Sequence, residues 1–195
     1  MSTDQSPNFL PTFTPADLAG DGFGLRPWSL VGEPERRARE LAALAADPAI
    51  SLWNPLPIRT VAHAERWLAG RVSGWERGDL ASFALLTPDF DGLLGSVTVR
   101  WVDRGDALAM IGYWLVPDAR GRGLATRGLE AATRWAFTTA DARRIELGHA
   151  VGNTASCRVA GRAGYLLEGT LRQSHCFGDG NYHDEHLHAR LASDA

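Results

Sequence analysis

The segment RGRGLATRGLEAA, residues 120–132, places glycines and arginines directly after an apolar run and before a stretch with helical spacing. A glycine-rich turn between a strand and a helix exposes converging backbone N–H groups, and the helix dipole favours negative charge beside them. Gly121 and Gly123 would let a ligand approach the backbone closely. The pattern predicts a phosphate-binding turn, and the alternative is a surface turn with solvated arginines.

Two common nucleotide motifs do not fit this segment. A P-loop ends in lysine followed by serine or threonine, whereas Ala125 precedes Thr126 here. The glycine spacing also differs from the dinucleotide fingerprint, which needs an acidic residue on a second strand. A phosphate-bearing ligand of another class is therefore expected.

The pattern Arg120-x-x-Gly123-x-Ala125 resembles the pyrophosphate loop of the GNAT superfamily of acyl-CoA-dependent N-acyltransferases. Farther along, Asn153-x-x-Ser156, AGY, LEGTLRQ and the tyrosine and aspartate of NYHDE resemble the Rim-type branch, which contains ribosomal-protein N-terminal acetyltransferases. The resemblance follows the element order over residues 23–191 and is specific from residue 113 onward.

This resemblance implies that acetyl-CoA, or another acyl-CoA such as succinyl-CoA, is the co-substrate. Its pyrophosphate would lie on the loop, and its thioester would lie between two splayed strands, residues 107–116 and 144–151. The implied cofactor-binding residues are Leu115, Val116, Arg120, Gly121, Arg122, Gly123, Leu124, Ala125, Thr126, Asn153 and Ser156.

Attack of an amine on a thioester needs a route for the amine proton, donors for the oxyanion and an acid for the leaving thiolate. Many superfamily members use a tyrosine as that acid, but its place holds Ala160. In the Rim-type branch a serine takes this role, which makes Ser156 the predicted proton donor and Asn153 its predicted partner in the catalytic set. For both residues helix capping is the alternative.

The general base is left open among three residues. Closer Rim-type enzymes carry a glutamate where this chain has His175, and a neutral histidine can accept a proton at neutral pH. His149 and Glu168 are further candidates, and an exposed hairpin histidine is the alternative for His175. A covalent acyl-enzyme on Cys157 is disfavoured, because a small cysteine in an apolar helix is usually part of the core.

The histidine-rich segment YHDEHLH alternates along a strand without a recognised metal spacing, so no metal is expected. Trp53, Asn54 and His175 are expected on the acceptor side, where the amine is a small molecule or a peptide N-terminus. Two other function classes stay open: a catalytically idle acyl-CoA-binding module, and a binder of polyanions that uses the arginine loop.

Periodicity supplies the elements that would position these residues. Helices are expected from Pro34, after Thr60, from Leu124 and after Asn153, and strands in the intervening apolar runs. The prediction is a mixed α/β (α+β) GNAT fold: a mostly antiparallel sheet of about seven strands, splayed between strands 4 and 5, with about four helices. Residues 1–20 are expected to be an extended or disordered arm, and residues 21–195 one acyltransferase domain.

Composition limits the possible partners. The chain has 195 residues, a formal net charge of −3 and two cysteines. The charge argues against wholesale nucleic-acid binding, and no apolar run approaches the roughly 20 residues that span a bilayer. The first residues lack a basic start and an apolar core, so a cytoplasmic location is expected. Resemblance to relatives adds the expectation of a homodimer.

Overall fold

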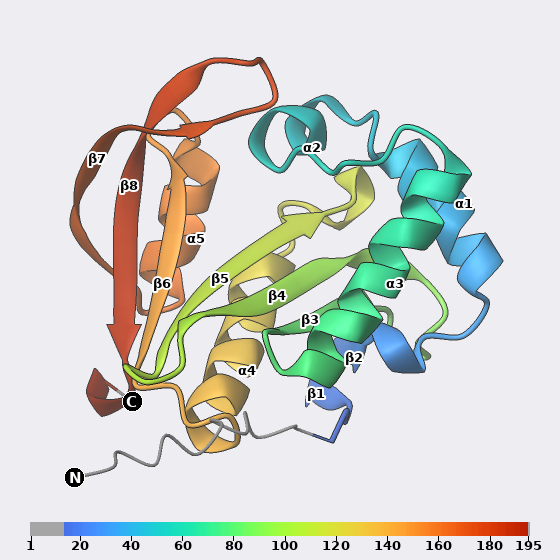
Figure 1. Cartoon of the computed structure of the whole chain (residues 1–195), viewed down its shortest axis with the longest axis horizontal. Coiled ribbons are helices and arrows are strands. Elements are labelled where there is room, and N and C mark those ends of the chain that lie inside the picture. Colours follow the sequence, from blue (N-terminus) through green and yellow to red (C-terminus); the bar gives the residue numbers. More distant parts are fainter. Residues whose placement is uncertain (1–13, 195) are drawn as a thin grey trace, which may run out of the picture.

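A computed structural model describes residues 14–194, which form one sheet in the order β1-β2-β3-β4-β5-β6-β8-β7 (Figure 1). The strands are β1 Leu18–Gly20, β2 Phe23–Pro27, β3 Leu80–Leu86, β4 Leu93–Asp103, β5 Leu108–Leu115, β6 Arg144–Ala150, β7 Leu166–Cys176 and β8 Tyr182–Leu191. The α-helices are α1 Pro34–Leu44, α2 Pro48–Trp53, α3 Val61–Arg77, α4 Leu124–Thr138 and α5 Thr154–Arg162.

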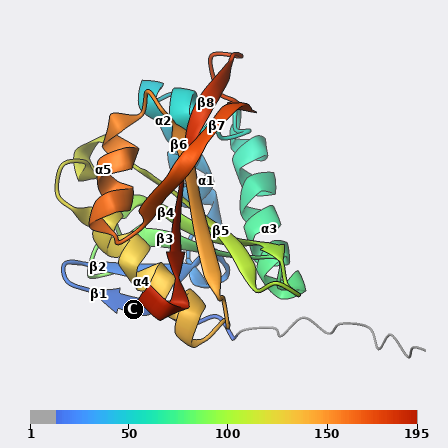
Figure 2. The same ribbon diagram turned by 90° about the vertical axis from the view of Figure 1, so that its left-hand side faces the viewer.

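The helices lie on both sides of the sheet, with α4 and α5 on one side and α1 and α3 on the other (Figure 2). One face of α4 packs into the core: Ala125, Leu129, Ala132 and Ala136 are at most 6% exposed. A second apolar cluster packs α1 and α3 against β3 and Trp114. Within residues 14–194, no helix combines the length and apolar character needed to cross a bilayer.

The parallel pair β5 and β6 separates soon after it begins. Their backbone pairing runs from Leu108 opposite Arg144 only as far as Met110 opposite Glu146. β5 stays paired with β4 up to Leu115, and β6 stays paired with β8 up to Ala150. The far halves of both strands therefore diverge, which confirms the predicted splay; an additional first strand makes them the fifth and sixth strands.

The described part of the chain has eight strands and five α-helices, one strand and one helix more than expected. Leu18–Gly20, expected to belong to the arm of residues 1–20, pairs with β2 as β1; residues 1–13 of that arm lie outside the described residues. The sequence SLWNPLP, residues 51–57, indicated a turn, but its first three residues end the helix α2, which Asp47 caps through the amides of Ala49 and Ile50. Both elements are too short for a periodic sequence pattern.

Candidate active site

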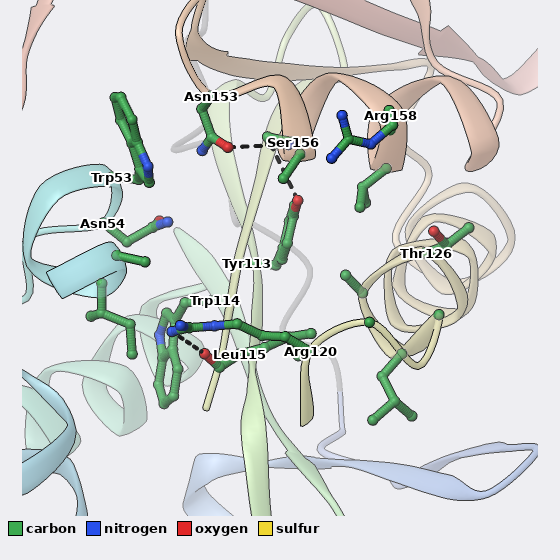
Figure 3. A pocket seen from close by; sticks show the side chains of 18 of the residues that line it. Trp53, Asn54, Tyr113, Trp114, Leu115, Arg120, Thr126, Asn153, Ser156 and Arg158 are labelled. Atoms are coloured by element: carbon green, nitrogen blue, oxygen red, sulfur yellow. Dashed lines mark hydrogen bonds between the residues drawn. The ribbon is translucent and has the colours of Figure 1, made fainter. Parts of the chain in front are cut away.

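A cavity of about 390 Å³ occupies the opening between the separated strands. Its walls come from α2, the end of β5, the glycine-rich loop, and the first turns of α4 and α5 (Figure 3). Segments far apart in the sequence meet here because the splay leaves the ends of β5 and β6 without a common strand pairing.

The predicted loop has the conformation that its glycines allow. Gly121 and Gly123 have φ values of 74° and 73°, in the left-handed region that a side chain disfavours. Gly123 is the N-cap residue of α4, and no side chain caps this helix. The first-turn N–H groups of a helix have no acceptor within the helix, so those of α4 are available to an anionic ligand.

Arg120 connects this loop to α2. Its guanidinium donates to a carboxylate oxygen of Asp47 at 2.6 Å and to the carbonyl of Leu115 at 3.1 Å. The hydrogen bond from Arg120 lowers the pKa of Asp47, and the amides that Asp47 caps lower it further. Arg120 therefore clamps one wall of the cavity to another, in addition to bringing positive charge.

Most of the residues expected to bind the cofactor line the cavity; Val116 and Arg122 do not. Val116 packs against the apolar core, and the carbonyl of Arg122 accepts a hydrogen bond from Arg127. The residues of the expected set that do line it are Leu115, Arg120, Gly121, Gly123, Leu124, Ala125, Thr126, Asn153 and Ser156.

Arg158 and Arg162 of α5 also line the cavity, and sequence reasoning missed both. With Arg120 they bring three guanidinium groups to its wall. Their positions follow from helical geometry, since residues four apart share a face of α5. A helical projection from Asn153 onward would have revealed this basic face.

Ser156 lines the cavity and is 7% exposed. Its backbone N–H donates to Asn153 Oδ1 at 3.2 Å, so Asn153 performs the capping and leaves the serine hydroxyl free of that task. Tyr113, on β5, donates its hydroxyl to Ser156 Oγ at 3.2 Å. Burial raises the pKa of Tyr113, which keeps it protonated as a donor. Sequence reasoning assigned no role to Tyr113.

The three candidates for the base lie in different surroundings. His149 lines a second cavity of about 50 Å³, which shares Tyr113 and Ser156 with the first, and burial lowers its pKa. His175 is exposed on β7 against the ring of Phe177, outside both cavities. Glu168 binds Arg144 at 2.5 Å, and this hydrogen bond lowers its pKa. The structure brings only His149 to the site.

The expected acceptor side is built where α2 meets the β7–β8 hairpin. Trp53 and Asn54 line both cavities. The ring of Trp53 packs edge-on against Phe177 with centroids 5.8 Å apart, and the amide of Gly178 donates to the carbonyl of Leu52 at 3.0 Å. The hairpin and α2 thus form one wall beside Ser156, as Figure 3 shows for the α2 side.

Comparison with known proteins identifies the family of this chain. The family model described as "Acetyltransferase (GNAT) domain" matches residues 25–166. The chain belongs to the GNAT acetyltransferase family. This confirms the resemblance expected from the loop around Arg120 and the motifs that follow it.

Similar proteins of this family include Rim-type enzymes. The ribosomal-protein-serine acetyltransferase of Escherichia coli (strain K12) is 29% identical over 141 residues, which cover 72% of this chain and 77% of that protein. Further curated N-acetyltransferases align over 52% to 55% of their own lengths. These relatives support N-acetyltransfer as the activity of the GNAT domain.

Solved structures share the fold. RimL, a ribosomal L7/L12 alpha-N-protein acetyltransferase in complex with coenzyme A, has a TM-score of 0.79 at 22% identity, over 92% of this chain and 100% of its own. The microcin C7 self-immunity acetyltransferase MccE, in complex with acetyl-CoA and AMP, has a TM-score of 0.76 at 19% identity, over 88% of this chain and 93% of its own.

The contacts of Asp47 predict a two-part stability effect. Asp47→Asn keeps an N-cap acceptor but loses the charge that pairs with Arg120, which should cost up to about 1 kcal/mol of unfolding free energy. Asp47→Ala also loses the cap and should cost about 1 kcal/mol more. Urea denaturation of the three proteins at neutral pH measures both differences.

Low pH should remove the stabilisation that comes from the charge of Asp47. Because the folded-state pKa of Asp47 is lowered, the advantage of the parent over Asp47→Asn is complete above the unfolded-state value, about pH 4. It should decline as pH falls through the folded-state pKa. An advantage that persists unchanged at lower pH would show that the carboxylate charge does not hold Arg120.

Proposed function

We propose that the protein transfers an acetyl or other short acyl group from acyl-CoA to a primary amine by direct attack within a ternary complex. The observation that carries the proposal is the splayed cavity, which joins an uncapped helix N-terminus at Gly123 to a buried hydroxyl at Ser156. One end of this cavity suits a pyrophosphate and the other suits a thioester.

Each part of the donor has matching chemistry in the cavity. The pyrophosphate would accept from the N–H groups that begin α4, with Arg158 and Arg162 supplying further positive charge. The pantetheine arm would extend along the unpaired part of β5, where backbone groups have no partner from β6. The thioester would then lie beside Ser156.

The reaction forms a C–N bond and breaks the C–S bond. The neutral amine attacks the thioester carbonyl, the tetrahedral intermediate collapses, and Ser156 Oγ donates its proton to the departing thiolate. The nitrogen of the tetrahedral intermediate gives up one proton, which restores the Ser156 hydroxyl directly or through water, so the proton that the amine loses balances the proton that the sulfur gains. Tyr113, which donates to Ser156 Oγ, positions the serine and stabilises its deprotonated form.

The acceptor enters past Trp53 and Asn54, along the wall that α2 and the β7–β8 hairpin form together. We propose a peptide N-terminus, because the relatives named above include acetyltransferases of ribosomal proteins. A small-molecule amine is the alternative acceptor, since the self-immunity acetyltransferase MccE, solved with acetyl-CoA and AMP, shares this fold. With both cysteines free, the protein suits a reducing cytoplasm.

Acyl transfer should depend strongly on the Ser156 hydroxyl. Thiol release from acetyl-CoA and succinyl-CoA, measured over a panel of amines and N-terminal peptides, identifies the donor and the acceptor class. Ser156→Ala should then lower kcat by about 10²-fold or more, because general acid catalysis is lost. The affinity for the acyl-CoA should stay near that of the parent.

The controls separate chemistry from folding. Ser73→Ala, on α3 and away from the cavity, should keep the parental rate. Tyr113→Phe should cost about tenfold, the value of one hydrogen bond. A parental kcat in Ser156→Ala would contradict the assigned proton donor, and acyl-CoA binding without turnover of any acceptor would favour the idle module.

We also propose a homodimer built on the edge strand β7. Its exposed leucines include Leu166, Leu167 and Leu171, which are 68%, 54% and 45% exposed. β7 is the last strand of the sheet, so its outer backbone groups can pair with another chain.

Light scattering after size exclusion measures this assembly. The parent should have twice the chain mass, and Leu166→Glu combined with Leu171→Glu should give a monomer, because charge opposes burial of the edge. Val102→Glu, which alters an exposed apolar residue of β4, should stay dimeric. A monomeric parent would refute the proposed assembly.

A further inference from the structure

Four potential metal ligands converge behind the active site, from three separate elements. They are His149 of β6, His186 and His188 of β8, and Cys157 of α5. One ligand atom of each lies within 4.8 Å of the others. We propose that these side chains bind a divalent metal ion of the zinc class. The proposal does not depend on the acyl-transfer function.

The register of the sheet creates this cluster. His149 is directly opposite His186, and Leu147 is opposite His188, in the β6–β8 ladder. Alternate residues of a strand share a face, so His186 and His188 project to the same side as each other. The helix α5 packs against β6 and β7 and brings Cys157 to this group.

Two rings are oriented as metal-binding histidines usually are. His149 Nδ1 lies 2.8 Å from the carbonyl oxygen of Ala150, and His188 Nδ1 lies 3.3 Å from that of Tyr165. A carbonyl can only accept, so each Nδ1 is the donor and each neutral ring presents Nε2 as a lone pair. A carbonyl partner on the other ring nitrogen is the usual second-shell arrangement of a histidine ligand.

The Nε2 atoms of these two rings lie close together. His149 Nε2 and His188 Nε2 are 3.2 Å apart, within hydrogen-bond distance although both are acceptors in these tautomers. His186 adds a buried Nδ1 that has no hydrogen-bond partner within residues 14–194. Buried nitrogens are normally satisfied, and a bound ion would satisfy all three.

Two of the spacings are close to those of tetrahedral coordination. With metal–nitrogen and metal–sulfur bonds of ordinary zinc length, a tetrahedron has N–N edges of about 3.3 Å and N–S edges of about 3.6 Å. The nitrogens of His149 and His188 are 3.2 Å apart, and Cys157 Sγ is 3.9 Å from His188 Nε2. A three-histidine, one-cysteine set favours zinc over calcium or magnesium, which prefer oxygen ligands.

Four protein ligands make a closed site of the structural type. The ion would join α5 to β6 and β8 at Cys157, the residue directly after Ser156, and so hold the serine-bearing turn against the sheet. No metal was expected from the sequence because the histidines of YHDEHLH alone lack a recognised metal-binding spacing. The ligands from β6 and α5 reach the site only through the tertiary fold.

Metal titration of the chelator-treated full-length chain tests the site. Zn²⁺ should bind with one equivalent per chain and raise the Tm. Co²⁺ should give the visible absorption of a tetrahedral site and a near-ultraviolet thiolate-to-cobalt band. Cys157→Ser should abolish the thiolate band, and His186→Gln should weaken binding by about 100-fold or more.

Matched controls use the other cysteine and an exposed histidine. Cys176→Ser and His175→Ala should keep the parental stoichiometry, affinity and cobalt spectrum, because neither side chain faces the cluster. Far-ultraviolet circular dichroism checks that each variant is folded. A parent chain that binds no equivalent of Zn²⁺ or Co²⁺, or a thiolate band that survives Cys157→Ser, would overturn the proposal.

Discussion

The separation of β5 from β6 is the constraint on which the rest of the structure depends. Pairing stops after Met110 and Glu146, yet each strand continues with its other neighbour. The sheet therefore remains continuous, and it opens only between the far halves of β5 and β6. Backbone groups left without a strand partner must find another partner, because unpaired buried polar groups are costly. A ligand that lies along β5 meets that requirement, which ties the geometry of the sheet to donor binding.

Two helices begin beside this opening, and only one of them has a side-chain cap at its N-terminus. α4 starts at Gly123 without a side-chain cap, so its N–H groups face the cavity for an anion. α5 is capped by Asn153, which satisfies the helix internally and leaves Ser156 to bond with Tyr113. In the proposed reaction, one helix supplies electrostatic binding and the other supplies a proton donor. The clamp between Arg120 and Asp47 fixes the distance between these parts and α2.

Local patterns in the sequence predicted the parts of the site that depend on local structure. The loop glycines, the start of α4 and the Asn153 to Ser156 spacing are of this kind, and the fold followed from periodicity and from family resemblance. β1 and α2 were missed because they have three and six residues. Tyr113, Arg158 and the cluster around His149 depend on tertiary packing. The strand pairing is irregular between Leu171 and His175, where Gln173 has a φ of 46°. His175 lies beyond this irregularity and outside the cavities. The spacing of residues in the sequence does not reveal such a register shift.

The central claim is that acyl-CoA occupies the opening between β5 and β6. Amide chemical-shift mapping during titration with acetyl-CoA tests it most directly, because it reports the contact surface residue by residue. The account predicts the largest shifts at residues 121–126 and 153–158, with small shifts at the groove between α1 and α3 on the other side of the sheet. Saturable shifts confined to that groove, with residues 121–126 unchanged, would contradict the account.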